Sequence, residues 1–294
     1  MQTIDQHAIS EQQDAAVQTI DKHTIGEQYA NDGYYFPIDA MTSVQAAGYR
    51  DEFESLEDAI EDSGIGRGGQ LNQMHAVLCF VNEIVRNERI LDAVEAAIGP
   101  DILVWGSTFF IKEPRTTGFV SWHQDLRYWG LEDEDAMVSA WLALGPVTKT
   151  NGCMQFIPAS HTGGLLEHKD RFDADNFLYR GQEVQVDVDE SKIVHVELEP
   201  GQFSLHHGHL LHASPANHSD IRRWGLTINY IAPHNRQVVA DRDFAMLVRG
   251  KDAHGNFQPV PAPESDLSDD ALRWHRKLLA AKDQATFDGA TQRA

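Results

Sequence analysis

A series of short apolar or alternating segments between residues 102 and 231 constrains the fold of this chain more than any other feature. The segments cover residues 102–112, 117–123, 137–145, 152–158, 193–198, 202–211 and 223–231. Turn-forming pairs such as Asn151-Gly152 and Pro200-Gly201 separate several of them. Many short strands with such turns between them are typical of a mainly β fold. We therefore expect a double-stranded β-helix, or jelly-roll, core over about residues 101–235.

Helical patterns flank this β region. Residues 43–62 form an acidic segment with helical character, and residues 83–98 carry apolar side chains at helical spacing before the stop signal Gly99-Pro100. Near the C-terminus, Ser268 is a suitable N-cap, and the two aspartates after it oppose the positive end of a helix. We expect a helix in each of these three places.

The N-terminal residues are polar and partly duplicated. Residues 2–12 and 18–28 are nearly the same segment, but a short unit copied once is too little for a solenoid. We predict a polar extension over residues 1–30. We expect residues 31–294 to form a single domain, because β-barrels and sandwiches often reach about 200 to 250 residues as one unit.

The charge and cysteine content narrow the choice of partners and compartment. With 24 basic and 45 acidic residues the net charge is −21, which repels nucleic acid, and no basic stripe offsets it. No apolar run is long enough to cross a membrane. Cys79 and Cys153 are the only cysteines, and the N-terminus lacks a signal-peptide pattern, so we expect a cytoplasmic protein. The oligomeric state does not follow from the sequence.

The motif His123-Gln124-Asp125 is a candidate metal site. Alternate residues of an extended chain point the same way, so these two side chains should lie about 6.6 Å apart on one face. Two histidines and one carboxylate on one face of an octahedral ion leave three positions open, as in Fe(II) oxygenases. The third ligand should then be a histidine from elsewhere in the chain.

The segment from Ser204 to Ser214 is the obvious source of that histidine, but it contains four. They are His206, His207, His209 and His212. His206 and His212 share one strand parity while the other two share the opposite one, so alternation alone does not select the ligand. A zinc site formed by the first three is a weaker interpretation, because structural zinc usually recruits cysteines.

The chain resembles the phytanoyl-CoA dioxygenase family of Fe(II)- and 2-oxoglutarate-dependent oxygenases. The resemblance spans about residues 33–249. It is most specific in Trp122-His123-Gln124-Asp125, in Gly152-Cys-Met-Gln-Phe-Ile-Pro-Ala-Ser-His161, and in Leu211-His212-Ala-Ser-Pro-Ala-Asn217. The family's usual Pro-Gly-Ser-His reads Pro158-Ala159-Ser160-His161 here, which is a mild departure in a loop.

The resemblance implies roles for specific residues. It makes His123, Asp125 and His212 the iron ligands, with 2-oxoglutarate as co-substrate and O₂ as oxidant. It further implies that Arg223 binds the C5 carboxylate of 2-oxoglutarate, with Arg222 as the alternative. A guanidinium suits this task because its planar fork can bind both carboxylate oxygens.

Two more residues carry an implied role in co-substrate binding. The resemblance places Ser214 beside the carboxylate and Trp141 in the wall of the co-substrate pocket. A serine that caps a turn and a tryptophan of the ordinary core are the alternatives for these two positions.

Other acidic and histidine patterns have plainer explanations. Two further His-x-Asp motifs, at His168 and His218, lie in polar stretches. The acidic runs 132–135 and 187–190 lack EF-hand spacing, so solvated loops are favoured over calcium sites.

The expected activity is hydroxylation of an unactivated C–H bond of a small metabolite, with release of succinate and CO₂. Related halogenases have a small residue where this chain has Asp125, which disfavours halogenation. A non-catalytic binding protein of the same fold and a zinc-dependent hydrolase are the alternatives. An anionic substrate would suit the cationic and aromatic residues that could face the pocket, which are Lys112, Arg127, Tyr128, Trp129, Arg180 and Arg236. We also expect residues 163–192 to form a mobile loop that orders over bound substrate.

Overall fold

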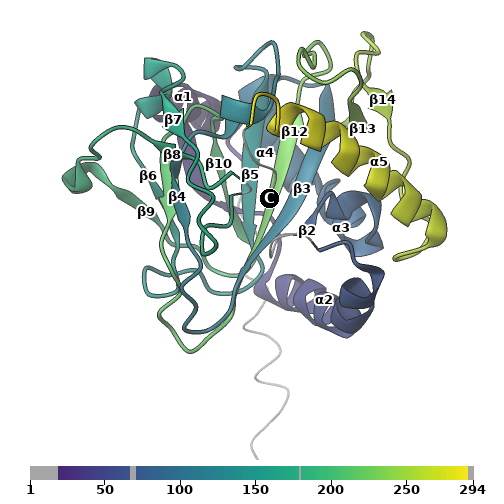
Figure 1. The fold of residues 1–294 in the computed structure, drawn as a ribbon, viewed down its shortest axis with the longest axis horizontal. Coiled ribbons are helices and arrows are strands. Elements are labelled where there is room, and N and C mark those ends of the chain that lie inside the picture. Colours follow the sequence, from purple (N-terminus) through teal and green to yellow (C-terminus); the bar gives the residue numbers. More distant parts are fainter. Residues whose placement is uncertain (1–18, 67–70, 179, 291–294) are drawn as a thin grey trace, which may run out of the picture.

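Two antiparallel sheets face each other in the computed structural model, which describes residues 19–66, 71–178 and 180–290 (Figure 1). The larger sheet has the strand order β1-β10-β5-β12-β3-β13-β14, and β2 also pairs with β3. Its strands are β1 (Tyr34–Asp39), β2 (Leu71–Asn72), β3 (Ile102–Lys112), β5 (Met137–Ala143), β10 (Gln202–His206), β12 (Arg223–Ile231), β13 (Phe244–Arg249) and β14 (Gln258–Pro259). Only the β13–β14 pair is parallel.

The smaller sheet has the order β4-β11-β6-β9, formed by β4 (Val120–His123), β11 (His212–Ser214), β6 (Met154–Phe156) and β9 (Val194–Val196). The chain passes repeatedly between the sheets, since β3, β5, β10 and β12 belong to the larger one and β4, β6 and β11 to the smaller one. This alternation confirms the predicted double-stranded β-helix. A short hairpin of β7 (His168–Lys169) and β8 (Glu183–Val184) lies outside both sheets.

Helices cover the outer face of the larger sheet. They are α1 (Lys22–Asp32), α2 (Ser43–Ser63), α3 (Cys79–Ile84) and α4 (Glu88–Ile98). A fifth helix, α5 (Asp269–Thr286), packs against Phe244 of β13 through Trp274, and its last turns reach the cavity between the sheets. Every residue of β12 is buried, because helices cover one face of this strand and the smaller sheet lies over the other. Among the described residues, none of the helices is both long enough and apolar enough to cross a membrane.

Two of the predicted helices are confirmed. Helix α2 matches the prediction for residues 43–62 and begins with a capping box, in which Thr42 and Gln45 each satisfy the other's backbone N–H. Helix α5 begins after Ser268, whose hydroxyl accepts a hydrogen bond from the backbone N–H of Ala271.

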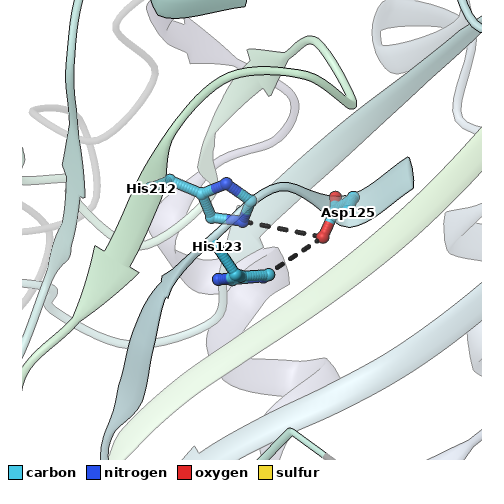
Figure 2. Close-up of side chains that lie close together, drawn as sticks. All are labelled: His123, Asp125 and His212. Carbon is cyan, nitrogen blue, oxygen red and sulfur yellow. Dashed lines mark ion pairs between the residues drawn. The ribbon is translucent and has the colours of Figure 1, made fainter. Parts of the chain in front are cut away.

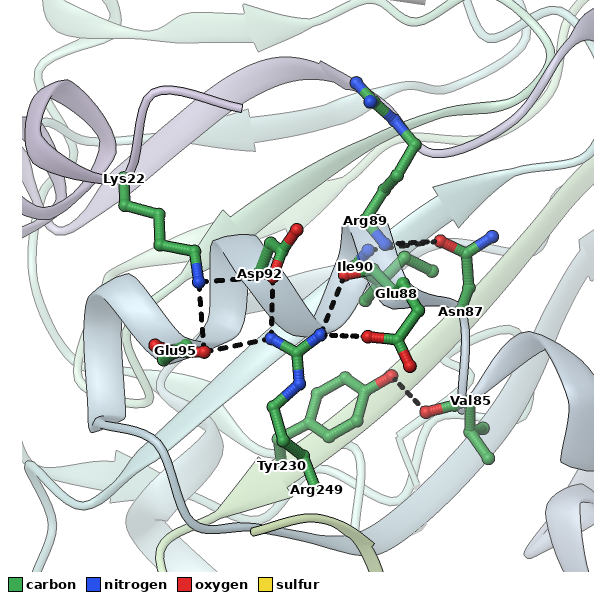
Figure 3. A network of polar contacts seen from close by, with 10 residues as sticks. All are labelled: Lys22, Val85, Asn87, Glu88, Arg89, Ile90, Asp92, Glu95, Tyr230 and Arg249. Carbon is green, nitrogen blue, oxygen red and sulfur yellow. Dashed lines mark hydrogen bonds and ion pairs between the residues drawn. The ribbon is translucent and has the colours of Figure 1, made fainter. Parts of the chain in front are cut away.

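The helix predicted over residues 83–98 is wrong in one respect, because the chain forms two helices there. Helix α3 ends at Ile84, and the side chain of Asn87 accepts hydrogen bonds from the backbone N–H groups of Arg89 and Ile90 to begin α4. The hydroxyl of Tyr230 donates to the carbonyl of Val85 at 3.1 Å, which satisfies an acceptor in the break (Figure 3). An asparagine that competes for backbone N–H groups favours such a new start.

The expected boundary at residue 30 also differs from the structure, because α1 runs through it. Ile25 and Tyr29 are buried, and α1 packs against α4. Lys22 pairs with Asp92 and Glu95 of α4, which also bind Arg249 of β13 (Figure 3). Partly exposed ion pairs contribute about 1 kcal/mol or less, whereas burying an isoleucine contributes about 1.5 to 3 kcal/mol, so apolar contact dominates this docking.

Two other sequence predictions need comment. The first copy of the duplicated segment, residues 2–12, lies outside the described residues, whereas the second copy supplies most of α1. The strand predicted over residues 202–211 ends at His206, and the chain then turns before β11. This turn explains why strand parity could not identify the distal histidine.

Candidate metal centre

Three side chains, two from neighbouring strands and one from the 3-10 helix that follows the first strand, converge at one point (Figure 2). His123 ends β4, Asp125 follows in the 3-10 helix η2 (Asp125–Tyr128), and His212 begins β11. Strands β4 and β11 pair so that His212 lies directly opposite His123, which brings together residues far apart in the sequence. The Nε2 atoms of His123 and His212 lie 3.3 and 3.6 Å from Oδ1 of Asp125.

The backbone fixes the orientation of both imidazoles. Nδ1 of His123 lies 2.9 Å from the carbonyl of Ser121, and Nδ1 of His212 lies 2.9 Å from the carbonyl of Leu210. A proton on each Nδ1 would donate to that carbonyl and leave each Nε2 lone pair directed at Asp125, as metal-bound histidines require.

Electrostatics in this buried site favour the protonation states of ligands. Burial and the neighbouring His123 hold the pKa of His212 well below its usual range, so its imidazole is neutral. Burial alone would raise the pKa of Asp125, but the adjacent imidazoles outweigh it and hold this pKa well below the usual range. Two imidazoles and one carboxylate form the donor set of a facial Fe(II) site. Among the described residues, no other cluster of three or more such side chains could hold a metal.

The second oxygen of Asp125 is held by neighbours on the larger sheet. Ser139 donates a hydrogen bond to Oδ2 at 3.0 Å and accepts one from Asn229 at 2.9 Å. Nε2 of His206 lies 3.4 Å from the same oxygen. His206, Ser139 and Asn229 occupy one row across β10, β5 and β12, so the pairing register assembles this support. The sequence indicated His206 only as one of four candidates for the third ligand.

The remaining histidines of that segment do not join the centre. His207 lies 3.1 Å from Asp135, and His209 lies 2.8 Å from Glu134. Residues of the acidic run 132–135 therefore pair with these two imidazoles. This pairing supports neither a calcium site in the acidic run nor a zinc site formed by the histidines. The two other His-x-Asp motifs are also occupied elsewhere, since Asp170 pairs with Arg180 and Asp220 with Arg115.

Arg223 lines one end of the same cavity, and the buried Lys112 lies beside it. Arg223 is 1% exposed and donates to the hydroxyl of Ser214 at 2.8 Å. Lys112 lies opposite Arg223 in the β3–β12 pair and donates to the same hydroxyl at 2.7 Å. Burial lowers the pKa of Arg223 to about 10, and burial together with Arg223 lowers the pKa of Lys112 to about 6. Arg223 forms no ion pair with an acid in the described part of the chain, and its Nε has no hydrogen-bond partner there, so this end suits an anionic ligand.

The wall beside Arg223 is formed by Trp141. Its ring centroid lies 5.3 Å from Cζ of Arg223. The ring also packs on Gly225 of the next strand, where a Cβ atom would lie 2.0 Å from it. Trp141 is therefore both a core residue and a cavity residue. Arg222 points elsewhere, because it pairs with Glu57 and Glu113.

The cavity continues past the metal centre to a second end. Its lining there includes Gln73, Trp105, Trp129 and Lys282. Asn229 of β12 separates this group from the metal centre, because its β5 partner Ser139 holds Asp125 and its β3 partner Gly106 adjoins Trp105. Of the cations predicted to face the pocket, Lys112 lies beside Arg223, Arg180 is tied to Asp170, and Arg236 is largely exposed beside Glu132. Lys282 was not among the predicted residues.

Comparison with known proteins agrees with this geometry. A sequence model of the phytanoyl-CoA dioxygenase (PhyH) family matches residues 29–225. A probable phytanoyl-CoA dioxygenase of Caenorhabditis elegans is 32% identical over 150 residues, which covers 48% of this chain and 47% of that protein. A probable alpha-ketoglutarate-dependent hypophosphite dioxygenase of Stutzerimonas stutzeri is 28% identical over 162 residues, 54% of this chain and 55% of that protein. The chain thus spans about half the length of these curated relatives.

Solved structures give a longer match. The apo form of ThoJ, a non-haem monooxygenase, superposes with a TM-score of 0.81 at 33% identity and covers 90% of this chain and 98% of that one. SnoK, a non-haem alpha-ketoglutarate-dependent carbocyclase from nogalamycin biosynthesis, shares the fold with a TM-score of 0.58 at 22% identity, over 85% of this chain and 95% of that one. The family resemblance expected from the sequence is confirmed: the chain belongs to the phytanoyl-CoA dioxygenase family, whose members use Fe(II) and 2-oxoglutarate.

Proposed function

We propose that this protein is an Fe(II)- and 2-oxoglutarate-dependent dioxygenase that hydroxylates an unactivated C–H bond of a small metabolite. In the balanced reaction, 2-oxoglutarate, O₂ and the substrate R–H yield succinate, CO₂ and R–OH. The observation that carries this proposal is the presence of the His123–Asp125–His212 triad and the buried Arg223 in the lining of one cavity.

The protein's own contribution is to bind and orient the reactants. Iron, once bound by the triad, supplies the oxidative chemistry of the reaction. Arg223 would bind the C5 carboxylate of 2-oxoglutarate, and Ser214, which accepts hydrogen bonds from Arg223 and from the neighbouring Lys112, would hold the guanidinium in place. Trp141 would exclude water beside it.

Asp125 is the feature that favours hydroxylation. Its Oδ1 faces both imidazoles, and its Oδ2 is held by Ser139, so the carboxylate is positioned to occupy one metal coordination site. A halogenase needs that position for a halide ion, and the retained carboxylate leaves no room for one.

The test combines a binding measurement with a turnover screen. We expect anaerobic protein to develop a visible charge-transfer band when Fe(II) and 2-oxoglutarate are both added. We expect succinate release in air when candidate metabolites are supplied with ascorbate. A band without succinate from any metabolite would favour a non-catalytic binding protein, and substrate hydrolysis without 2-oxoglutarate would favour a zinc hydrolase.

A further inference from the structure

The far end of the cavity combines residues within the family match, such as Trp105, with parts of the chain that the match does not reach. The family model ends at residue 225, whereas Asp243 lies just before β13 and Lys282 lies in the last turns of α5. These two residues meet Trp105 of β3, and Lys282 and Trp105 both line the cavity that contains the metal centre.

A β-bulge directs Trp105 into the cavity. In the β3–β12 pair, Asn229 lies opposite Gly106 and Tyr230 lies opposite Val104, so Trp105 has no partner. The consecutive residues Trp105 and Gly106 therefore both line the cavity, which regular strand alternation would not allow. Bulges that redirect a side chain in this way are frequent beside active sites.

Lys282 is a buried cation whose hydrogen-bonding capacity is unused. Its Nζ lies 2.7 Å from the ring centroid of Trp105 and 3.4 Å from Oδ1 of Asp243, yet it has no hydrogen-bond acceptor among the described residues. Asp243 is already satisfied by other donors: Trp105 Nε1 at 2.6 Å, Gln237 Nε2 at 3.2 Å and the Phe244 backbone N–H at 2.8 Å. A buried ammonium with one long ion pair and no hydrogen bond is incompletely satisfied, so a ligand oxygen that accepts from it would add to its stabilisation.

A second unsatisfied group lines the same cavity. Gln73 is buried, and its Oε1 has no hydrogen-bond donor among the described residues. Its φ of 59° lies in the left-handed region, which costs a non-glycine residue about 1 kcal/mol or more. A polar ligand that donates to Gln73 and accepts from Lys282 would satisfy both groups.

We propose that Lys282 binds a carboxylate group of the substrate while Trp105 and Trp129 pack against its apolar part, so that the substrate is a small organic acid. This inference rests on the proposed oxygenase function and names its substrate class. A single charge fits better than a polyphosphate, because among the described residues Lys282 is the one lysine or arginine of this wall, and the acids Asp243 and Asp283 lie close by. A cationic head group is disfavoured because Lys282 would repel it.

The experiment compares organic acids with their neutral counterparts. A panel of small carboxylic acids, each paired with its methyl ester and its primary amide, is added to the protein loaded with Fe(II) and saturating 2-oxoglutarate. Anaerobic thermal shift measures binding, and succinate release in air measures turnover. We expect acids to stabilise the wild-type protein and support turnover more than their esters and amides.

Variants on one helix assign the effect to Lys282. We expect Lys282→Met to raise the KM for the preferred acid by about 10- to 100-fold, the loss typical of a charge-assisted hydrogen bond, and Lys282→Arg to retain the preference for acids. Lys277→Met is the matched control, since Lys277 is exposed on α5 and contacts only Trp274 among described aromatic residues.

The outcomes separate this inference from the proposed function. Preference for neutral compounds, an equal response of wild type and Lys282→Met, or no stabilisation by any acid of the panel would overturn the role of Lys282. If the charge-transfer band persists in these cases, the oxygenase proposal is unaffected. Loss of the band in the wild-type protein would instead refute the proposed function itself.

Discussion

The two ends of the cavity use buried cations in different ways. At one end, Arg223 and Lys112 lie side by side on adjacent strands and share the hydroxyl of Ser214. At the other end, Lys282 comes from the C-terminal helix and lies against Trp105, with Asp243 nearby. The first end is part of the sheet, and the second is assembled from a helix, a loop and a bulge. A constant co-substrate needs a fixed site, whereas a substrate site can vary with the elements around the sheet.

The largest effect should come from the centre between the two ends. Asp125→Ala removes a metal ligand. Mutation of a residue that only supports a metal ligand often lowers metal affinity or activity by about 10- to 100-fold, so we expect succinate formation to fall by more than about 100-fold here. Iron content after anaerobic loading should fall in parallel. Asp220→Ala is the control, because Asp220 belongs to another His-x-Asp motif but is exposed beside Arg115. Normal turnover of Asp125→Ala would refute the metal site.

The second-largest effect should come from the end of the cavity that contains Arg223. Arg223→Ala leaves a buried carboxylate without its main partner, a loss of about 2 to 5 kcal/mol, so the KM for 2-oxoglutarate should rise by about 100-fold. The matched variant Arg222→Ala should leave it unchanged, since Arg222 faces Glu57 and Glu113. Titration of the charge-transfer band with 2-oxoglutarate measures both. Equal effects of the two variants would contradict the assignment.

A smaller, pH-dependent effect should come from Lys112. Because the pKa of Lys112 is about 6 without ligand, most of this amine is neutral at pH 8. A bound carboxylate favours the ammonium and raises that pKa, so binding takes up a proton and 2-oxoglutarate affinity falls as pH rises above 6. The Lys112→Met variant should bind 2-oxoglutarate about tenfold more weakly than the wild type at pH 6, and its affinity should no longer fall as the pH rises. Titrations of the charge-transfer band with 2-oxoglutarate at pH 6, 7 and 8 test this prediction. The same pH dependence of affinity in the wild type and the variant would count against the role of Lys112.

The smallest effect should come from the rim of the substrate end. Arg180 pairs with Asp170 and donates to the carbonyls of Thr286 and Asp288, which ties the segment 163–192 to the end of α5. Arg180→Ala should speed proteolytic cleavage within that segment by several-fold and leave 2-oxoglutarate binding intact. Arg171→Ala is the control, because its pair with Glu183 is exposed. If bound substrate leaves the cleavage rate unchanged in both the wild type and the variant, the prediction that this segment orders over the substrate is wrong.

The sequence predicted one end of the cavity much better than the other. His123 and Asp125 form a local motif, and the family pattern reached His212 and Arg223. Lys112 appeared only as an unassigned cation, because its place beside Arg223 depends on the register between β3 and β12. Trp105 and Lys282 come together only through a bulge and the docking of α5, and no spacing in the sequence encodes either.

The helical layer shows the same limit. Residues 43–62 were predictable from pattern and capping, but α1 carries only Ile25 and Tyr29 as buried side chains, too few to give a helical signal. The break at Asn87 was hidden because apolar residues continue at helical spacing on both sides of it. The contact with α4 decides the position of α1, and the contact of Tyr230 in β12 with Val85 decides the break.

The extra residue in β3 divides this strand into two segments that can change independently. From Gly106 to Lys112 the pairing with β12 keeps one register, and from Leu103 to Val104 it keeps another, offset by one position. Insertions, deletions or substitutions on the Trp105 side would therefore be absorbed at the bulge and leave the alignment of Lys112 with Arg223 undisturbed. A lineage could thus acquire new substrates without having to rebuild its hold on 2-oxoglutarate.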